Sequence, residues 1–150
     1  MRAAIETAVA NLTPAVHTDV GFRAALDETD FREWAEDSVD GVARRFTVLR
    51  RGDRFLGCSN GDVELHVTDA ELLVAYPTAG GWWGSHNLRA LDDTIDADAR
   101  QIDRAVGHDG GASYAAGVHM VMVARDDVER LPGVWVLPLR LEVTYDEDSA

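Results

Sequence analysis

The chain has 150 residues, and 46% of them are apolar, which is enough to build one domain with a buried core over residues 1–150. It contains 27 acidic residues, fourteen arginines and no lysine. The resulting net charge of −13 argues against binding nucleic acid through counterion release. The missing lysine excludes Schiff-base chemistry and Walker-type phosphate loops. We expect no membrane span and no signal peptide, and the single Cys58 cannot form an internal disulfide, so we expect a cytosolic protein.

The N-terminal third predicts one clear helix followed by an irregular acidic stretch. Ile5, Val9 and Leu12 share one helical face over residues 2–12, and Pro14 ends that element. Acidic residues interrupt the apolar pattern of 15–41, where we expect only a short helix near 29–37. From 42 to 49 the apolar period becomes two, which predicts a strand.

Two turns and a longer strand follow. Gly52-Asp53 predicts a hairpin turn, with the chain returning from Arg54. The sequence 59–62, Ser-Asn-Gly-Asp, predicts a second turn before a strand at 63–67. This strand continues through 72–76 after an expected bulge at 68–70.

The C-terminal half predicts a long amphipathic helix over 88–106 and two strands. Ser85 or Asn87 is the expected N-cap, and Gly107 suits the position just after the helix. The strands are expected at 118–123 and 134–145. Pro138 cannot donate a ladder hydrogen bond, so the last strand should lie at a sheet edge or be bulged there.

Together these elements predict an α+β fold in the order α-β-β-β-α-β-β. An antiparallel or mixed β-sheet should carry a short N-terminal helix and a long helix, both packed on one face.

Two features suggest surfaces that meet other proteins. An acidic block at 27–40 precedes a basic block at 44–54, and the blocks could pair within a subunit or between copies. Trp82-Trp83 lies between glycines, where both rings could anchor an interface, or one could cap the core while the other lies on the surface. The candidate interface residues are Glu33, Glu36, Asp37, Asp40, Arg44, Arg45, Arg50, Arg51, Arg54, Trp82 and Trp83.

The chain contains short motifs that mark catalytic or binding sites in other proteins, but their sequence context here argues against each of them. The sequence 57–61 spells G-x-S-x-G, but turn chemistry and a strand follow it instead of a helix. Arg51-Gly52-Asp53 is better explained as a turn than as an adhesion signal. The aspartates of 88–106 form i,i+4 pairs with arginines, and the five histidines lack metal-ligand spacing. We therefore expect no catalytic residues, metal or cofactor, and a protein that is not an enzyme.

The order of elements, with Glu64-Leu65-His66-Val67 before the long helix and the closing sequence 139–145, LRLEVTY, resembles the tail terminator (tail completion) proteins of long-tailed bacteriophages, of the lambda type. The resemblance covers nearly the whole chain. It rests on architecture and length and carries over no catalytic residue.

This resemblance implies a structural virion protein at the head–tail junction, assembled in the host cytoplasm. It implies a homo-oligomer, a hexameric ring that caps the tail tube, ends its polymerisation and joins it to the neck. The implied partners are the major tail tube protein and a neck or head-completion protein, while DNA passes through the acidic channel without specific binding. The alternatives are another connector protein, such as a stopper, or a small cytosolic enzyme or ligand-binding domain.

Overall fold

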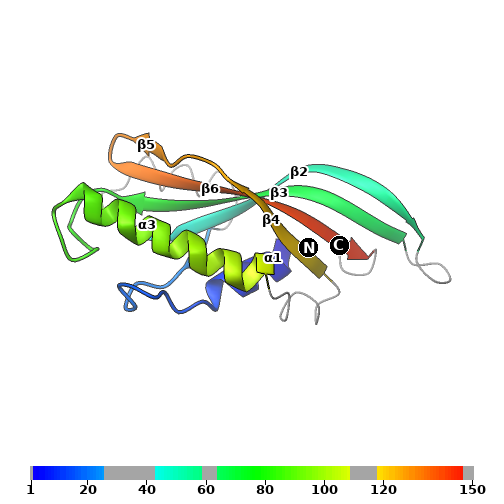
Figure 1. Cartoon of the computed structure of the whole chain (residues 1–150), viewed down its shortest axis with the longest axis horizontal. Helices are drawn as coiled ribbons and strands as arrows, with labels where there is room; N and C mark the ends of the chain where they lie inside the picture. Colours follow the sequence, from blue (N-terminus) through cyan, green and yellow to red (C-terminus); the bar gives the residue numbers. More distant parts are fainter. Residues whose placement is uncertain (1, 26–42, 59–63, 109–117, 147–150) are drawn as a thin grey trace.

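The computed structural model describes residues 2–25, 43–58, 64–108 and 118–146 (Figure 1). The elements are α1 (Arg2–Ala10), β1 (Arg23–Ala24), β2 (Arg45–Cys58), β3 (Glu64–Pro77), α3 (Leu88–Ile102), the π-helical turn η2 (Asp103–His108), β4 (Val118–Arg125), β5 (Glu129–Leu131) and β6 (Val134–Asp146). The strands form one sheet in the order β1-β2-β3-β6-β4, and β5 pairs with β6.

The sheet is mixed. β1 runs parallel to β2, and every other described pairing is antiparallel. The sheet twists strongly, so that β2, β3 and β6 change their order in the view between its left and right halves (Figure 1). The predicted α+β class and order of elements are confirmed.

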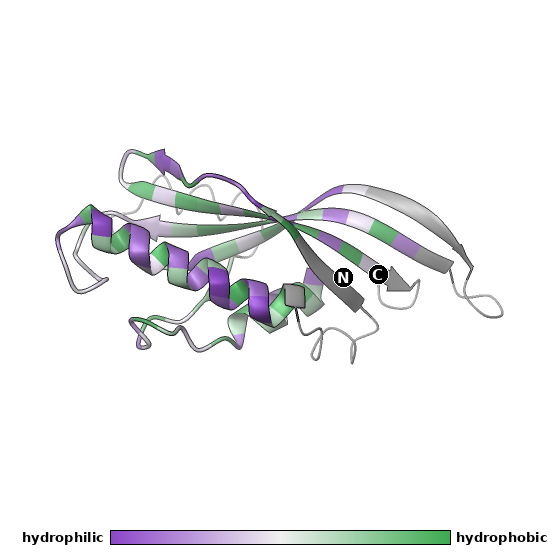
Figure 2. Cartoon of the chain, viewed as in Figure 1, coloured by the Kyte–Doolittle hydropathy of each residue, from purple (hydrophilic) through white to green (hydrophobic). Residues whose placement is uncertain are grey.

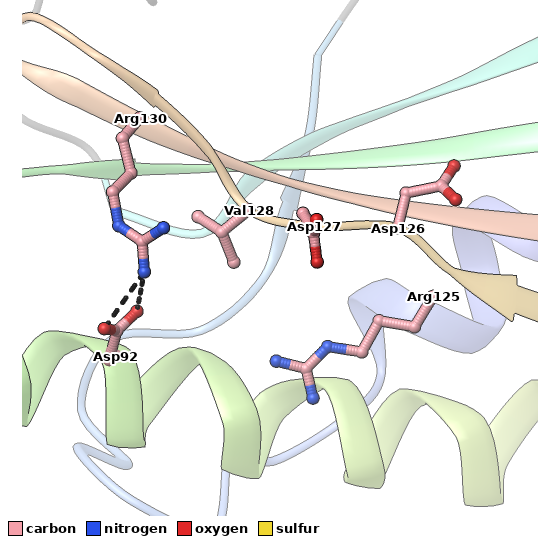
Figure 3. A pocket seen from close by; sticks show the side chains of 6 residues that line it. All are labelled: Asp92, Arg125, Asp126, Asp127, Val128 and Arg130. Carbon is pink, nitrogen blue, oxygen red and sulfur yellow. Dashed lines mark hydrogen bonds and ion pairs between the residues drawn. The ribbon is translucent and has the colours of Figure 1, made fainter.

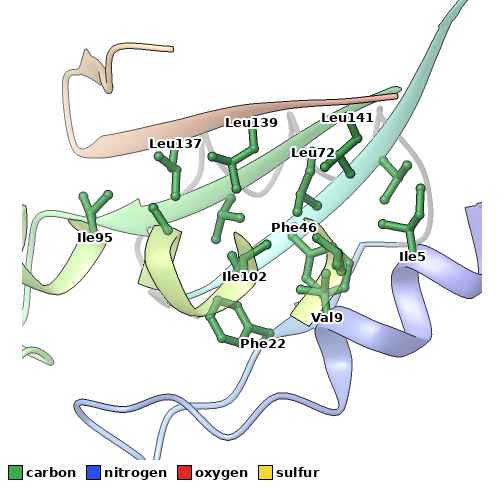
Figure 4. Packing of buried hydrophobic residues seen from close by; sticks show 14 of the residues in the cluster. Ile5, Val9, Phe22, Phe46, Leu72, Ile95, Ile102, Leu137, Leu139 and Leu141 are labelled. Atoms are coloured by element: carbon green, nitrogen blue, oxygen red, sulfur yellow. The ribbon is translucent and has the colours of Figure 1, made fainter. Parts of the chain in front are cut away.

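Both helices lie on one face of the sheet and bury their apolar sides against it. Ile5 and Val9 of α1 and Ile95 and Ile102 of α3 have no exposed surface. They pack on alternate residues of the central strands, among them Leu139 of β6 (Figure 4). Figure 2 shows the same alternation of apolar and polar residues along α3 and the strands. The predicted placement of both helices on one face is therefore confirmed.

The long helix begins where the sequence predicts and ends differently. The Asn87 side chain accepts a hydrogen bond of 2.9 Å from the Arg89 N–H, which confirms Asn87 as the N-cap. The prediction that Gly107 follows the helix is wrong, because η2 continues the helical path as a π turn through His108. Val106, which lies within this turn, has no exposed surface and belongs to the main core.

The predicted hairpin at Gly52-Asp53 is wrong. β2 continues through this dipeptide to Cys58, and Gly52 does not adopt the positive φ that a tight turn with Gly first requires. The ladder instead shifts register between Arg50 and Gly52, so the bulge predicted at 68–70 lies on the opposing strand. The Thr68 hydroxyl donates to the Gly52 carbonyl at this bulge.

The last strand is predicted to lie at a sheet edge or to be bulged at Pro138; it is not at an edge, and its ladder with β3 passes Pro138 without a register shift. β6 lies between β3 and β4, and Pro138 is opposite Leu73. On the other side, the β4 ladder ends at Arg125 and the β5 ladder starts at Glu129. The Pro138 carbonyl accepts a hydrogen bond from the Asp126 N–H in this gap. The missing proline N–H thus falls where the neighbouring strand is interrupted, and a central position is tolerated.

Two expected elements, the helix near 29–37 and the turn at 59–62, lie outside the described residues. Among the helices that are described, none is long and apolar enough to cross a membrane.

Candidate functional site

The most elaborate polar site lies inside the protein, around Arg44. This arginine immediately precedes β2 and has a φ of +61°, in the left-handed region that non-glycine residues rarely adopt. Its backbone N–H donates to the Ala75 carbonyl, and its carbonyl accepts from the Arg23 N–H. The strained conformation thus lies between two strands that hold it in place, and the side chain points to the helix-covered face.

The guanidinium of Arg44 uses all five of its N–H donors. Two donate to the carboxylate of Asp98, from Nε at 2.7 Å and from Nη2 at 2.9 Å. The other three donate to the backbone carbonyls of Val16, His17 and Val20 at 2.7–2.8 Å. Neither side chain of the Arg44–Asp98 pair has any exposed surface. A buried guanidinium in this arrangement has no unsatisfied donor.

Aromatic rings complete the surroundings of this pair. The Arg44 guanidinium lies 5.5 Å from the ring centroid of Phe22 and 5.6 Å from that of Trp82. Trp82 also stacks on Tyr76, with centroids 6.1 Å apart. The Tyr76 hydroxyl donates to Asp98 at 3.0 Å. We call Arg44, Asp98 and Tyr76 the arginine cluster.

Burial governs the titration of the arginine cluster. Burial raises the pKa of Asp98, while the hydrogen bonds from Arg44 and Tyr76 act in the opposite direction. Burial, followed by the negative charge of Asp98, raises the pKa of Tyr76 well above its usual value. The phenol therefore remains a proton donor to the carboxylate throughout the neutral range.

The arginine cluster joins three parts of the chain. Arg44 belongs to the start of β2, Asp98 to α3, and the three carbonyl acceptors to the segment 16–20. Its polar atoms are saturated and lie away from solvent, which suits a structural role better than substrate binding. The prediction that Arg44 is an interface residue is wrong, since this side chain has no accessible surface.

The two tryptophans pack mainly inward. Trp83 is only 3% exposed and belongs to the main core, while Trp82 is partly buried against it. The indole N–H of Trp82 donates to the Pro77 carbonyl, and that of Trp83 donates to the Asn87 carbonyl. A turn, not a strand, carries them, with Gly81 and Gly84 at positive φ, so adjacent rings can both reach the core.

The remaining candidate arginines belong to one strand, β2. Arg51 lies on β2 with its side chain 54% exposed and pairs with Glu71 at 3.0 Å. Arg50 is exposed, and Arg45 is half-buried. The side chain of Arg54, and Glu33, Glu36, Asp37 and Asp40 with the whole acidic block, lie outside the described part of the chain.

The polar face of α3 forms ion pairs with the end of β4 and with β5. Arg130 pairs with Asp92 at 3.0 Å, and Arg125 pairs with Asp96. Asp96 also forms the predicted i,i+4 pair with Arg100 at 2.8 Å. Figure 3 shows Arg125 and Arg130 directed toward α3 across a hollow of about 580 Å³. Both arginines already pair with aspartates of α3. The ion pairs around this hollow therefore connect the helix to the sheet.

The Asp96 pair predicts a pH-dependent contribution to stability. The hydrogen bond from Arg125 lowers the pKa of Asp96 below its ordinary value of 3.8. The charged carboxylate therefore stabilises the fold at neutral pH, and this contribution is lost as the pH falls through the lowered pKa. Asp96→Asn should reduce the free energy of unfolding by up to about 1 kcal/mol at neutral pH, because the pair is solvent-exposed. Urea titrations of both proteins across the acid range should converge well below pH 3.8; a constant difference would contradict this role.

Other motifs provide no reactive group in the described residues. Gly57 and Cys58 end β2, and the remaining residues of the G-x-S-x-G match, 59–61, lie outside the described part. The tripeptide Arg51-Gly52-Asp53 lies within β2, at its first register shift. Within the described ranges, no group of three or more His, Cys, Asp or Glu side chains is placed to hold a metal ion.

Comparison with known proteins adds no family: no protein-family model matches the chain, and no curated protein matches it significantly.

Proposed function

We propose that this chain is a tail terminator subunit, a structural virion protein that forms a ring on the end of a phage tail tube. The ring stops polymerisation of the tube and joins the tail to the neck beneath the capsid. The proposal starts from the resemblance in the order of elements, and the dimensions and charge of the fold support it.

The observation that carries the proposal is a sheet that extends well beyond the helices covering it. β2 and β3 each contain fourteen residues, a length of about 46 Å. α3 contains fifteen residues, about 22 Å, and η2 continues it for six residues. The paired ends of β2 and β3 extend past both helices (Figure 1). A long two-stranded extension suits a subunit that reaches neighbouring proteins.

Charge and the nature of the buried site agree with this role. A subunit with a net charge of −13 would give a ring whose channel repels the DNA backbone, so DNA would pass without adhering. The arginine cluster stabilises the scaffold and leaves no donor for a substrate. Both properties fit a rigid assembly component.

The first test is the mass and shape of the purified protein. A hexamer of this 16.4 kDa chain should have a mass of about 98 kDa by light scattering and appear as rings in negative stain. A protein that stays monomeric at all accessible concentrations, including in the presence of tail tubes, would contradict the proposal.

The second test addresses the biological role. Deleting the gene from the phage or prophage that carries it should yield abnormally long tails that are not attached to heads, and the wild-type gene should restore normal particles. Tails of normal length beside leaking heads would instead identify a stopper.

A further inference from the structure

We propose that β4 of one copy pairs, in antiparallel orientation, with β2 of the next copy, so that the ring carries one continuous sheet. This inference rests on the proposed ring and names the surfaces that close it. Each copy would contribute β2, β3, β6 and β4 in this order, and the β4 edge of one copy would meet the β2 edge of its neighbour.

Both outer strands have open edges among the strands that the structure describes. β1 pairs with β2 only at Arg45 and Phe46, so no described strand follows β2 from Thr47 to Cys58. At the opposite side of the sheet, β4 pairs with β6 and with no other described strand. In the right half of Figure 1, β2 forms the upper margin and β4 the lower margin. A strand edge that no neighbouring strand covers is a template for another strand.

The two open edges lie at the same height along the sheet. At one end, Val118 of β4 pairs with Tyr145 of β6. Tyr145 also pairs with His66 of β3, and His66 pairs with Phe55 of β2. At the other end, Arg125 aligns through Leu139 and Leu72 with Val48. The whole of β4 therefore matches residues 48–55 of β2, beyond the part that β1 occupies. A rotation about a ring axis, without a shift along the strands, would bring these edges together.

The strand directions also fit. β2, β3, β6 and β4 alternate in direction, so β4 runs opposite to β2. An even number of alternating strands lets the next copy continue the same antiparallel pattern. Each edge strand also contains a register shift, between Arg50 and Gly52 in β2 and between Met122 and Ala124 in β4. The two edges thus have equal residue counts over the matched span.

The sequence of β4 favours coverage of its edge. Residues 118–124, VHMVMVA, contain no proline, lysine, arginine or acidic residue, the groups that usually protect an edge strand from pairing. Val123 is 61% exposed, the largest exposure among the exposed large apolar side chains of the described residues. Because two different edges meet, the contact is heterologous, and such contacts generate closed rings when the rotation closes.

Cysteine cross-linking tests the pairing directly. Val123 and Arg51 line the same hollow of about 310 Å³ on the face away from the helices, with Arg140 and Glu142 between them. Within one chain, three strand spacings separate β4 from β2, about 14 Å. A disulfide requires Cα atoms within about 7 Å, so this pair can close only between copies. The variant Val123→Cys/Arg51→Cys is made in a Cys58→Ser background.

The expected result is a ladder of disulfide-linked species up to the hexamer on non-reducing gels, with most of the monomer lost. The control Leu131→Cys/Arg51→Cys replaces an exposed apolar residue of β5, away from the proposed contact, and should remain monomeric on the same gel. Circular dichroism checks that each variant is folded.

The outcomes separate this inference from the proposed function. If light scattering shows the ring but the Val123 variant cross-links no more than its control, edge pairing is wrong and the tail terminator proposal stands. If the wild-type protein forms no oligomer, the ring and the edge pairing both fail. If β4 cross-links only to added tail tube protein, its edge serves the tube, and pairing between copies is overturned.

Discussion

Arg44→Met should lower the free energy of unfolding by about 3–5 kcal/mol, the largest effect expected of any single substitution at a buried charge. The substitution removes the two donors that Asp98 receives from Arg44, and among the described residues only Tyr76 then donates to the buried carboxylate. It also leaves the carbonyls of Val16, His17 and Val20 without the guanidinium. The segment 16–20 should then detach from α3.

Urea unfolding followed by circular dichroism measures this loss, and two variants calibrate it. Arg51→Met removes an exposed partner of Glu71 and should cost less than about 1 kcal/mol. Arg44→Met/Asp98→Leu removes both buried charges and should recover much of the stability, because no uncompensated carboxylate remains. Equal losses for Arg44→Met and Arg51→Met would show that the arginine cluster does not stabilise the fold.

Leu139→Ala is expected to cost about 2–5 kcal/mol through the cavity that it leaves in the core. Leu139 has no exposed surface and lies on β6, opposite Leu72 and beneath the helices (Figure 4). Neighbouring strands and α3 surround this position, so the core can collapse only partly around the missing atoms.

Thermal unfolding provides the measurement, since a chain of this size loses about 2–4 °C in Tm for each kcal/mol. The matched control is Leu88→Ala, because Leu88 begins α3 with 44% of its surface exposed and buries far less area. A Tm change for Leu139→Ala no larger than that of the control would mean that the core lies elsewhere.

The tandem tryptophans show how much of a local pattern can be interpreted from sequence. Their flanking glycines make the backbone adaptable, and the structure forms a turn there, with Gly80, Gly81 and Gly84 at positive φ. Whether the rings face a partner or the core depends on what lies beneath the turn. Trp82 stacks on the nearby Tyr76 and contacts Arg44, which is distant in sequence, so only the assembled fold turns it inward.

The arginine cluster was missed although its signal lies in the sequence. Asp98 occupies the apolar stripe of α3, since it follows Leu91 and Ile95 and precedes Ile102 at steps of four, three and four. Arg44 likewise shares its alternation with Phe46 and Val48, both core residues. A charge at a core position of each pattern predicts a buried pair of opposite sign. The prediction that Arg44 belongs to a basic surface block did not take into account that Arg44 lies on the core side of this alternation.

The elements and their inward faces follow from local patterns in the sequence, because periodicity and capping depend on residues a few positions apart. The helix starting at Asn87, the alternation of β3 and β6, and the apolar face of α1 all follow from such local rules. The order of the strands, by contrast, depends on long-range contacts. These contacts place β6 in the centre despite Pro138, continue β2 through Gly52 along β3, and bring Arg44 to Asp98. Those outcomes depend on pairing between segments far apart in the chain, where burial and long ladders outweigh local turn preferences.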